Sequence, residues 1–105
     1  MKILVALVGT KYRGQEMVDL LASLKQGERL VLVREPGNQY DPNAVQVWAC
    51  GHHIGYIKGS QNKELAMAMD AAALAMPGGA MRSAYAKEAK LAVDGGKQPM
   101  VEIDE

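Results

Sequence analysis

The residues best suited to chemistry in this chain lie in a segment with two prolines, residues 34–45, which reads R-E-P-G-N-Q-Y-D-P-N-A-V. The segment sets an aromatic ring, Tyr40, beside a carboxylate, Asp41. Because Pro42 bars the preceding residue from the α-helical region, we expect the Asp41 carboxylate to be held in a defined direction, ready to accept a hydrogen bond. The alternative is that Asp41 and Asn38 only hydrogen-bond their own backbone in Asx-turns.

A second group of candidates follows the first apolar run. Lys11 and Arg13 can contact phosphates, and the ring of Tyr12 between them can stack on a nucleic-acid base, which is worth about 1–3 kcal/mol. These residues would form one site with Tyr40 and Asp41 if the fold brings both segments to the same end of a barrel. The alternative is an ordinary amphipathic loop whose tyrosine covers the edge of the core.

A third group lies in the run I-G-Y-I-K, residues 54–58. Gly55 permits close backbone approach, Tyr56 carries a ring, and Lys58 is placed to reach a phosphate. Lys63, at the start of a predicted helix, could do the same with help from the helix N-terminus. The alternative is a strand glycine at a bulge together with two solvated lysines.

Cys50, His52 and His53 are candidates for a metal site, since thiolate and imidazole are zinc ligands. Closed zinc sites need four ligands with wider spacing, and the sequence contains no second cluster. We therefore interpret residues 50–53 as a hairpin turn and expect neither a metal nor a cofactor. No set of nucleophile, base and orienting residue can be assembled, so an enzyme is not expected.

A β-rich scaffold must position these residues. Apolar runs separated by turn signals predict six strands, of which the three in the middle form an antiparallel meander. The fifth run could equally form one or two helical turns over residues 86–92. The predicted strands cover residues 2–9, 30–34, 44–49, 54–57, 80–93 and 100–104, with a turn at Gly95, Gly96 and Lys97.

Two helices are predicted where apolar residues recur every three to four positions. Gly27 can close the first helix, which we expect to cover one end of the sheet. Ser60 or Asn62 can cap the second, which ends at the sequence M-P-G-G of residues 76–79. The apolar faces consist of Met17, Leu20, Leu21 and Leu24 in the first helix and Leu65, Met69, Ala72 and Met76 in the second.

Length and composition narrow the class of protein. A chain of 105 residues fits one domain, and six short strands with two helices predict a mainly β, α+β barrel capped by helices. The 12 basic and 12 acidic residues cancel, so any anion site must be a local patch. With one cysteine and an apolar run too short for a signal peptide or a membrane span, we expect a cytoplasmic protein without a membrane partner.

Three motifs, in this order and spacing, closely resemble the HIRAN domain: V-G-T-K-Y at residues 8–12, the segment 34–45, and I-G-Y-I at residues 54–57. The resemblance spans about residues 3–75. The family occurs fused to fork-remodelling DNA helicases and nucleases, and as small free-standing bacterial and phage proteins. It implies one HIRAN-like domain over residues 1–105 and an OB-fold-like, six-stranded antiparallel barrel with two helices.

In the best understood helicase members the domain binds the 3′ end of single-stranded DNA. Carried over by position, the resemblance implies an end pocket formed by Lys11, Tyr12, Tyr40 and Asp41. Asp41 would accept a hydrogen bond from the terminal 3′-hydroxyl, since a carboxylate accepts from a hydroxyl but repels a phosphate in the same place.

Lys58 or Lys63 would hold the backbone of the bound strand. The chain departs from the DNA-binding helicase members at Arg13, where they carry a second aromatic residue. It also contains no Phe, whereas those members use a late phenylalanine at the base pocket, and Tyr85 is the aromatic residue left to replace it.

The resemblance therefore implies a nucleic-acid-binding module that recognises single-stranded DNA ends in DNA repair or replication, with a separate helicase or nuclease as a possible partner. One alternative is a protein-interaction adaptor of the same fold without DNA affinity. Another is an accessory domain that acts with a separate helicase, nuclease or phosphorus-anhydride hydrolase.

Overall fold

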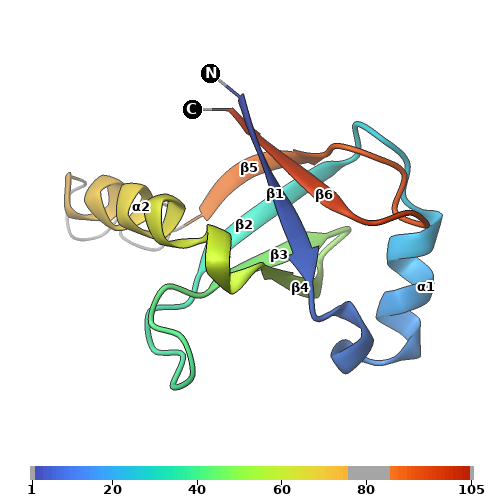
Figure 1. Ribbon diagram of the computed structural model, residues 1–105, viewed down its shortest axis with the longest axis horizontal. Coiled ribbons are helices and arrows are strands. Elements are labelled where there is room, and N and C mark those ends of the chain that lie inside the picture. Colours follow the sequence, from blue (N-terminus) through green and yellow to red (C-terminus); the bar gives the residue numbers. More distant parts are fainter. Residues whose placement is uncertain (1, 76–85, 105) are drawn as a thin grey trace.

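The architecture is a closed barrel with helices outside it (Figure 1). The structure, a computed structural model, describes residues 2–75 and 86–104. Within these residues, six antiparallel strands close in the order β1-β4-β3-β2-β5-β6, which confirms the predicted six-stranded barrel with two helices. The elements are β1 (Lys2–Val8), η1 (Thr10–Arg13), α1 (Gln15–Ser23), β2 (Arg29–Arg34), β3 (Val45–Ala49), β4 (His52–Ile57), η2 (Gly59–Gln61), α2 (Lys63–Ala75), β5 (Ala86–Leu91) and β6 (Met100–Asp104), where η marks a 3₁₀ helix.

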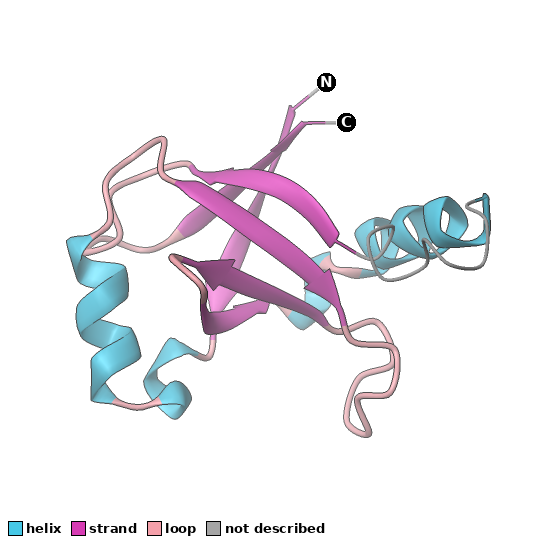
Figure 2. Cartoon of the chain, turned by 180° about the vertical axis from the view of Figure 1, so that it is seen from behind, coloured by secondary structure: helices cyan, strands magenta, loops and turns pink. Residues whose placement is uncertain are grey.

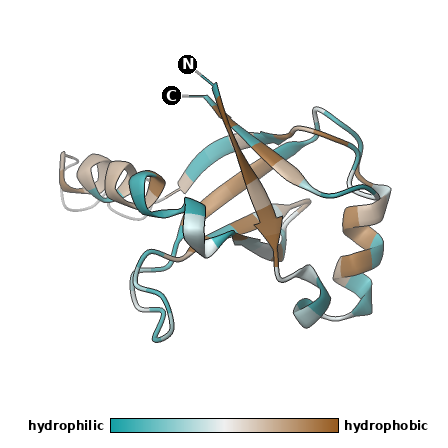
Figure 3. Ribbon diagram, in the orientation of Figure 1, coloured by the Kyte–Doolittle hydropathy of each residue, from teal (hydrophilic) through white to brown (hydrophobic). Residues whose placement is uncertain are grey.

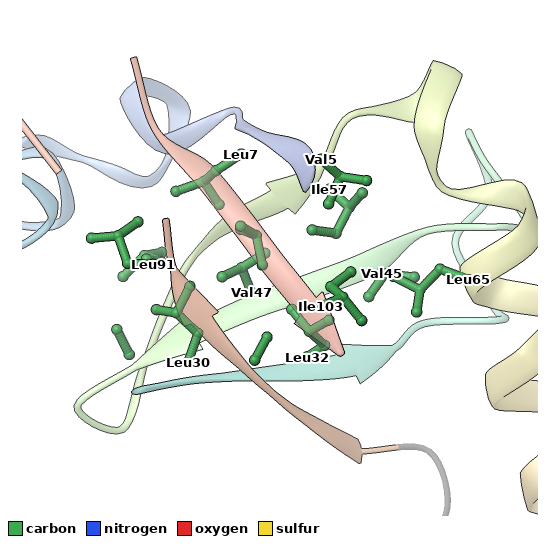
Figure 4. Close-up of a cluster of buried hydrophobic side chains, with 14 of the residues drawn as sticks. Val5, Leu7, Leu30, Leu32, Val45, Val47, Ile57, Leu65, Leu91 and Ile103 are labelled. Atoms are coloured by element: carbon green, nitrogen blue, oxygen red, sulfur yellow. The ribbon is translucent and has the colours of Figure 1, made fainter. Parts of the chain in front are cut away.

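Aliphatic side chains fill the inside of the barrel because successive residues of a strand face opposite sides. In β2, Leu30 and Leu32 are fully buried, whereas Val31 between them faces outward and is half-buried. Burying each such side chain stabilises the fold by about 1.5–3 kcal/mol. Figure 4 shows the cluster, whose labelled members come from all six strands and α2: Val5, Leu7, Leu30, Leu32, Val45, Val47, Ile57, Leu65, Leu91 and Ile103.

The strands β2, β3 and β4 form the predicted antiparallel meander. A two-residue turn, Cys50 and Gly51, joins β3 to β4, with φ angles of 52° and 78°. Positive φ at both positions gives a tight hairpin whose twist matches that of the flanking strands. The prediction that the turn extends over residues 50–53 was wrong at its end, because His52 and His53 already pair with β3.

β4 lies very close to β1 at Gly55. The pairing of β3 with β4 shifts register between Val47 and Trp48, which marks a β-bulge beside this glycine. A Cβ atom on Gly55 would lie 2.7 Å from the carbonyl oxygen of Val8. The bulge and the close backbone approach are therefore both present at this position.

α1 packs on the barrel at the opposite side from α2 (Figure 1). Its predicted apolar face is confirmed, since Leu21 in the helix and Leu24 directly after it are buried and Met17 and Leu20 pack against the core. The predicted end at Gly27 was wrong, because α1 ends at Ser23. The loop before β6 contacts this helix so closely that a Cβ atom on Gly95 would lie 1.8 Å from the Leu21 carbonyl oxygen. A glycine is therefore required where the loop crosses the helix.

α2 buries one stripe of side chains against the barrel. The prediction was right for Leu65 and Met69 but wrong for Ala72, which is exposed; Ala66 and Ala73 are buried instead. At 3.6 residues per turn, the four buried positions lie within an arc of about 100° around the helix axis, and Ala72 lies outside that arc. Met76 and the predicted stop at residues 76–79 lie outside the described residues.

β5 and β6 complete the barrel. β5 pairs with β2 and β6, so a strand rather than a helical turn forms over residues 86–91. The predicted start of this strand, residues 80–85, lies outside the described residues, and Tyr85 lies there too. β6 pairs with β1, and Lys2 lies opposite Asp104, so the beginning of β1 and the end of β6 lie side by side (Figure 2).

Candidate nucleic-acid interface

The β2–β3 loop, residues 35–44, projects from the barrel as a hydrophilic segment (Figure 3) and is anchored by Arg34. Arg34 is 7% exposed, and its side chain donates to the carbonyl oxygens of Pro42 at 2.7 Å and Ala44 at 2.9 Å. The same guanidinium binds both carboxylate oxygens of Asp70, at 3.0 and 3.1 Å. This planar fork ties the end of the loop to α2.

Inside the loop, side-chain acceptors hold the backbone in turns. Oδ1 of Asn38 accepts the backbone N–H groups of Tyr40 and Asp41, both at 2.9 Å. Oδ1 of Asp41 accepts the N–H of Asn43 at 2.9 Å. The Asx-turns of the alternative interpretation are thus present, and they leave the Tyr40 side chain 89% exposed.

The second oxygen of Asp41 has a partner outside the loop. Nδ2 of Asn62 donates to Oδ2 of Asp41 at 2.8 Å, and Asn62 is 1% exposed at the position before α2. Two hydrogen bonds therefore hold the Asp41 carboxylate in a defined direction. Because each carboxylate oxygen has two lone pairs, the group can still accept from a ligand.

Asp41 lines a groove of about 690 Å³, here called the Tyr40 groove. The groove runs between the β2–β3 loop and the ends of β1 and β4. Two carboxylates lie on its wall, and none of the described lysines or arginines lines it. The lining residues are Val8, Glu35, Gly37, Asn38, Gln39, Tyr40, Asp41, Ala44, Tyr56, Ile57 and Gly59.

Glu35, the other carboxylate, is held by three side-chain donors. It accepts hydrogen bonds from Gln46, from Asn38 and from the hydroxyl of Tyr56, the last at 2.9 Å. Burial alone would raise the pKa of Glu35, but these hydrogen bonds, together with the nearby His53, hold its pKa below the usual value. Glu35 therefore fixes the wall of the groove as an anion.

A row of rings runs from the Tyr40 groove along the outer face of β3 and β4. The Trp48 and His53 rings stack with centroids 5.6 Å apart, and Tyr56 meets His53 edge-on at 4.9 Å. Burial, and then the positive charge of Arg13, lower the pKa of His53. Burial, and then the hydrogen bond to Glu35, raise the pKa of Tyr56. Both rings are therefore favoured in their neutral forms.

Lys11 and Tyr12 line a different hollow of about 640 Å³, here called the Lys11 depression. The Lys11 ammonium lies 5.0 Å from the centroid of the Tyr12 ring, and Tyr12 is 81% exposed. The depression and the Tyr40 groove adjoin, since Val8 lines both. The lining residues are Leu7, Val8, Gly9, Thr10, Lys11, Tyr12, Val18, Leu21, Ala22, Gly95, Gly96, Lys97 and Pro99.

The remaining predicted contact residues line neither hollow. Nε of Arg13 donates to the His53 carbonyl oxygen at 3.2 Å, which ties η1 to β4. Lys58 precedes η2 and Lys63 begins α2, and both are exposed. The structure therefore brings Tyr40, Asp41 and Tyr56 together, and places Lys11 and Tyr12 in the neighbouring depression.

The three candidate metal ligands are separated by their positions in the hairpin. Cys50 is exposed in the turn, and His52 and His53 follow each other in β4, where successive side chains face opposite sides. Nε2 of His53 lies 2.9 Å from the Gly55 carbonyl oxygen. Across residues 2–75 and 86–104, no group of three His, Cys, Asp or Glu side chains is arranged to hold a metal ion.

The site includes four residues that the sequence analysis did not single out as binding residues. Glu35 and Asn38 lie within the 34–45 motif, so their place beside Tyr40 was a detectable signal. Asn62 was predicted only as a helix cap, and Lys97 only as part of a turn. Nothing local in the sequence connects them to residues so distant along the chain.

The family assignment follows from comparison with known proteins. The HIRAN domain profile matches residues 2–93 of this chain. The chain belongs to the HIRAN domain family. No curated protein matches the chain.

Two solved structures share the fold over nearly the whole chain. A protein from Lactobacillus plantarum is 31% identical, with a TM-score of 0.65 over 97% of this chain and 96% of its own. The HIRAN domain of human HLTF is 21% identical, with a TM-score of 0.65 over 96% of this chain and 69% of its own. Among the described helices, none is long and apolar enough to cross a membrane.

Proposed function

We propose that this HIRAN domain binds the 3′ end of single-stranded DNA, with Asp41 accepting a hydrogen bond from the terminal 3′-hydroxyl. One observation carries the proposal: two hydrogen bonds orient the Asp41 carboxylate in a groove beside the exposed ring of Tyr40. A terminal base can stack on that ring, which contributes about 1–3 kcal/mol. Family membership supports the same function.

The electrostatics of the Tyr40 groove favour a free hydroxyl over a phosphate. Within the described part of the chain its lining contains Glu35 and Asp41 and no cation, so a 3′-phosphate would meet two negative charges without a counter-charge from these residues. A hydroxyl can instead donate to a carboxylate in a charge-assisted hydrogen bond, which is worth about 1.5–3 kcal/mol. The groove would thus distinguish a free end from a phosphorylated one.

In this proposal the chain is a binding module rather than an enzyme, and it works in the cytoplasm in DNA repair or replication. It would deliver a DNA end to a separate helicase or nuclease. Contacts to the phosphate backbone of the strand would come from three exposed residues, Arg13, Lys58 and Lys63. Arg13 follows Tyr12 of the Lys11 depression, and Lys58 lies between two residues that line the Tyr40 groove.

The test is a binding series with fluorescent strands that end in a 3′-hydroxyl, a 3′-phosphate or a hairpin, titrated at several salt concentrations. We expect the 3′-hydroxyl strand to bind at least about tenfold more tightly than the 3′-phosphate strand. With two or three phosphate contacts, the log-log salt slope should be about −1.4 to −2.1. Equal binding of all three strands would refute end recognition, and no binding would favour the adaptor alternative.

A paired exchange of Asp41 and Asn62 separates charge from folding. The double variant Asp41→Asn/Asn62→Asp keeps an amide-to-carboxylate hydrogen bond between the two positions but moves the charge away from the loop. We expect it to fold and to lose the preference for the 3′-hydroxyl. Unchanged preference in a folded double variant would remove Asp41 from the role proposed here.

A further inference from the structure

We propose that Lys97 and Lys11 together form a phosphate subsite in the Lys11 depression, distinct from the hydroxyl-accepting Tyr40 groove. This inference rests on the proposed function and specifies which part of the DNA strand binds in each hollow. The terminal sugar and base would occupy the Tyr40 groove, and a phosphate of the preceding linkages would lie between the two lysines.

The two adjoining hollows carry opposite charges. Among the described residues, the lining of the Lys11 depression contains Lys11 and Lys97 and no carboxylate, whereas the lining of the Tyr40 groove contains two carboxylates and no cation. Val8 lies in both linings, so the two hollows are neighbours on the surface. A ligand with a neutral, hydroxyl-bearing end and an anionic chain matches this pattern, and a nucleic-acid 3′ end has that chemistry.

Hydrogen bonds hold the Lys97 backbone in place. In the loop between β5 and β6, the Gly95 N–H donates a hydrogen bond to the Leu24 carbonyl oxygen at 2.9 Å. The Lys97 N–H donates to the Asp94 carbonyl oxygen at 3.0 Å. At the other end of the loop, the Pro99 carbonyl oxygen accepts a hydrogen bond from the Leu7 N–H of β1 at 3.1 Å. A fixed backbone means that only the lysine side chain must be ordered when a phosphate binds.

In the described part of the chain, neither Lys11 nor Lys97 forms an ion pair with a carboxylate. The acid nearest to Lys97 in sequence, Asp94, accepts from the Gln26 N–H at 2.8 Å and does not line the depression. Both ammonium groups are therefore free to contact a ligand anion.

The Tyr12 ring connects the two lysines to base stacking. Lys11 sits over this ring, which is exposed enough to receive a base on its open face. A base stacked there would bring its own phosphate to the side of the depression that carries the cations. Stacking and phosphate contact would thus come from consecutive parts of one nucleotide.

The experiment compares Lys97→Gln with the matched control Lys90→Gln, an exposed lysine on β5 that lines another hollow with Lys2 and Glu102. Each variant is titrated with a 3′-hydroxyl single strand at several salt concentrations. We expect Lys97→Gln to weaken binding about three- to fivefold and to make the salt slope less negative by about 0.7, as for one lost phosphate contact. Lys90→Gln should leave both values unchanged.

A second set of strands locates the contact. Each strand carries one uncharged methylphosphonate linkage at the first, second or third position from the 3′ end. The wild-type chain should bind one of the three modified strands less tightly than the unmodified strand. For that strand, Lys97→Gln should cause no further loss of affinity. A Lys97→Gln chain that binds and responds to salt like wild type would overturn this inference alone. A wild-type chain that binds no strand would overturn the proposed function, and this inference with it.

Discussion

Asn62 and Asp41, 21 residues apart in sequence, meet through a 2.8 Å hydrogen bond from the Asn62 amide to the Asp41 carboxylate. The contact joins the residue before α2 to the β2–β3 loop. Arg34 joins the same two elements through Asp70. The candidate end-binding loop is therefore held from α2 at two points, one polar and one ionic.

Replacing Asn62 by aspartate should make stability depend on pH. Two carboxylates at this distance cannot both ionise easily, so one pKa of the pair rises in the folded state. A carboxyl group with a raised folded pKa destabilises the fold as pH increases through its titration. Urea denaturation should show the deficit of Asn62→Asp growing from about pH 4 to pH 7. The control Asn62→Ala loses the hydrogen bond without adding charge, so its deficit should stay constant over that range.

Replacing Arg34 by lysine should destabilise the fold by about 1–3 kcal/mol, because a lysine cannot reproduce the fork that satisfies two carbonyl groups and a carboxylate. The matched control is Arg29→Lys in the exposed pair with Glu88, where we expect a change within about 0.5 kcal/mol. Equal effects on the free energy of unfolding would show that Arg34 does not anchor the loop.

Acidification below neutrality should destabilise the protein through His53. Its pKa is lowered from 6.5 by burial first and by Arg13 second, so the unfolded chain binds protons more readily than the folded one. The stabilising contribution is complete above the unfolded pKa and is lost as pH falls through the lowered folded pKa. His53→Gln should reduce the slope of stability against pH in that window. Glu35, whose pKa is also lowered, should add a slope of the same sign at more acidic pH.

Adding a methyl group at Gly55 should destabilise the barrel by about 1–3 kcal/mol, because the new Cβ would lie 2.7 Å from the Val8 carbonyl oxygen and the backbone must move. Gly37→Ala is the control, since a Cβ there meets no atom within 4 Å. We expect that variant to be neutral or more stable, and thermal unfolding of the two variants checks the difference.

Removing the ring of Tyr40 or Tyr12 should weaken single-strand binding by about 1–3 kcal/mol each, as for one lost base stack. Both side chains are more than four-fifths exposed, at 89% and 81%, so stability should change by no more than about 0.5 kcal/mol. The measurement is a titration of Tyr40→Leu and Tyr12→Leu with the 3′-hydroxyl strand, alongside thermal unfolding. Full binding by both variants would exclude stacking on these rings.

Local preferences explain how much of the fold was predictable. The alternation around Leu30 and Leu32 and the periodic face of Leu21 and Leu24 depend only on residues near in sequence, and both predictions were confirmed. The boundary at His52 was wrong because Cys50 and Gly51 both adopt positive φ and close the hairpin in two residues. Cysteine rarely adopts that conformation, so the sequence carried no clear sign of so short a turn.

The candidate site also has a part that local sequence predicts and a part that it does not. By itself, the sequence determined that Tyr40 and Asp41 share a rigid turn, since proline and Asx chemistry act over a few residues. Only the tertiary structure decided that Asn62 holds the Asp41 carboxylate and that Lys97 joins Lys11. Barrel closure sets these contacts, because it brings together chain segments whose separation leaves no local pattern in the sequence.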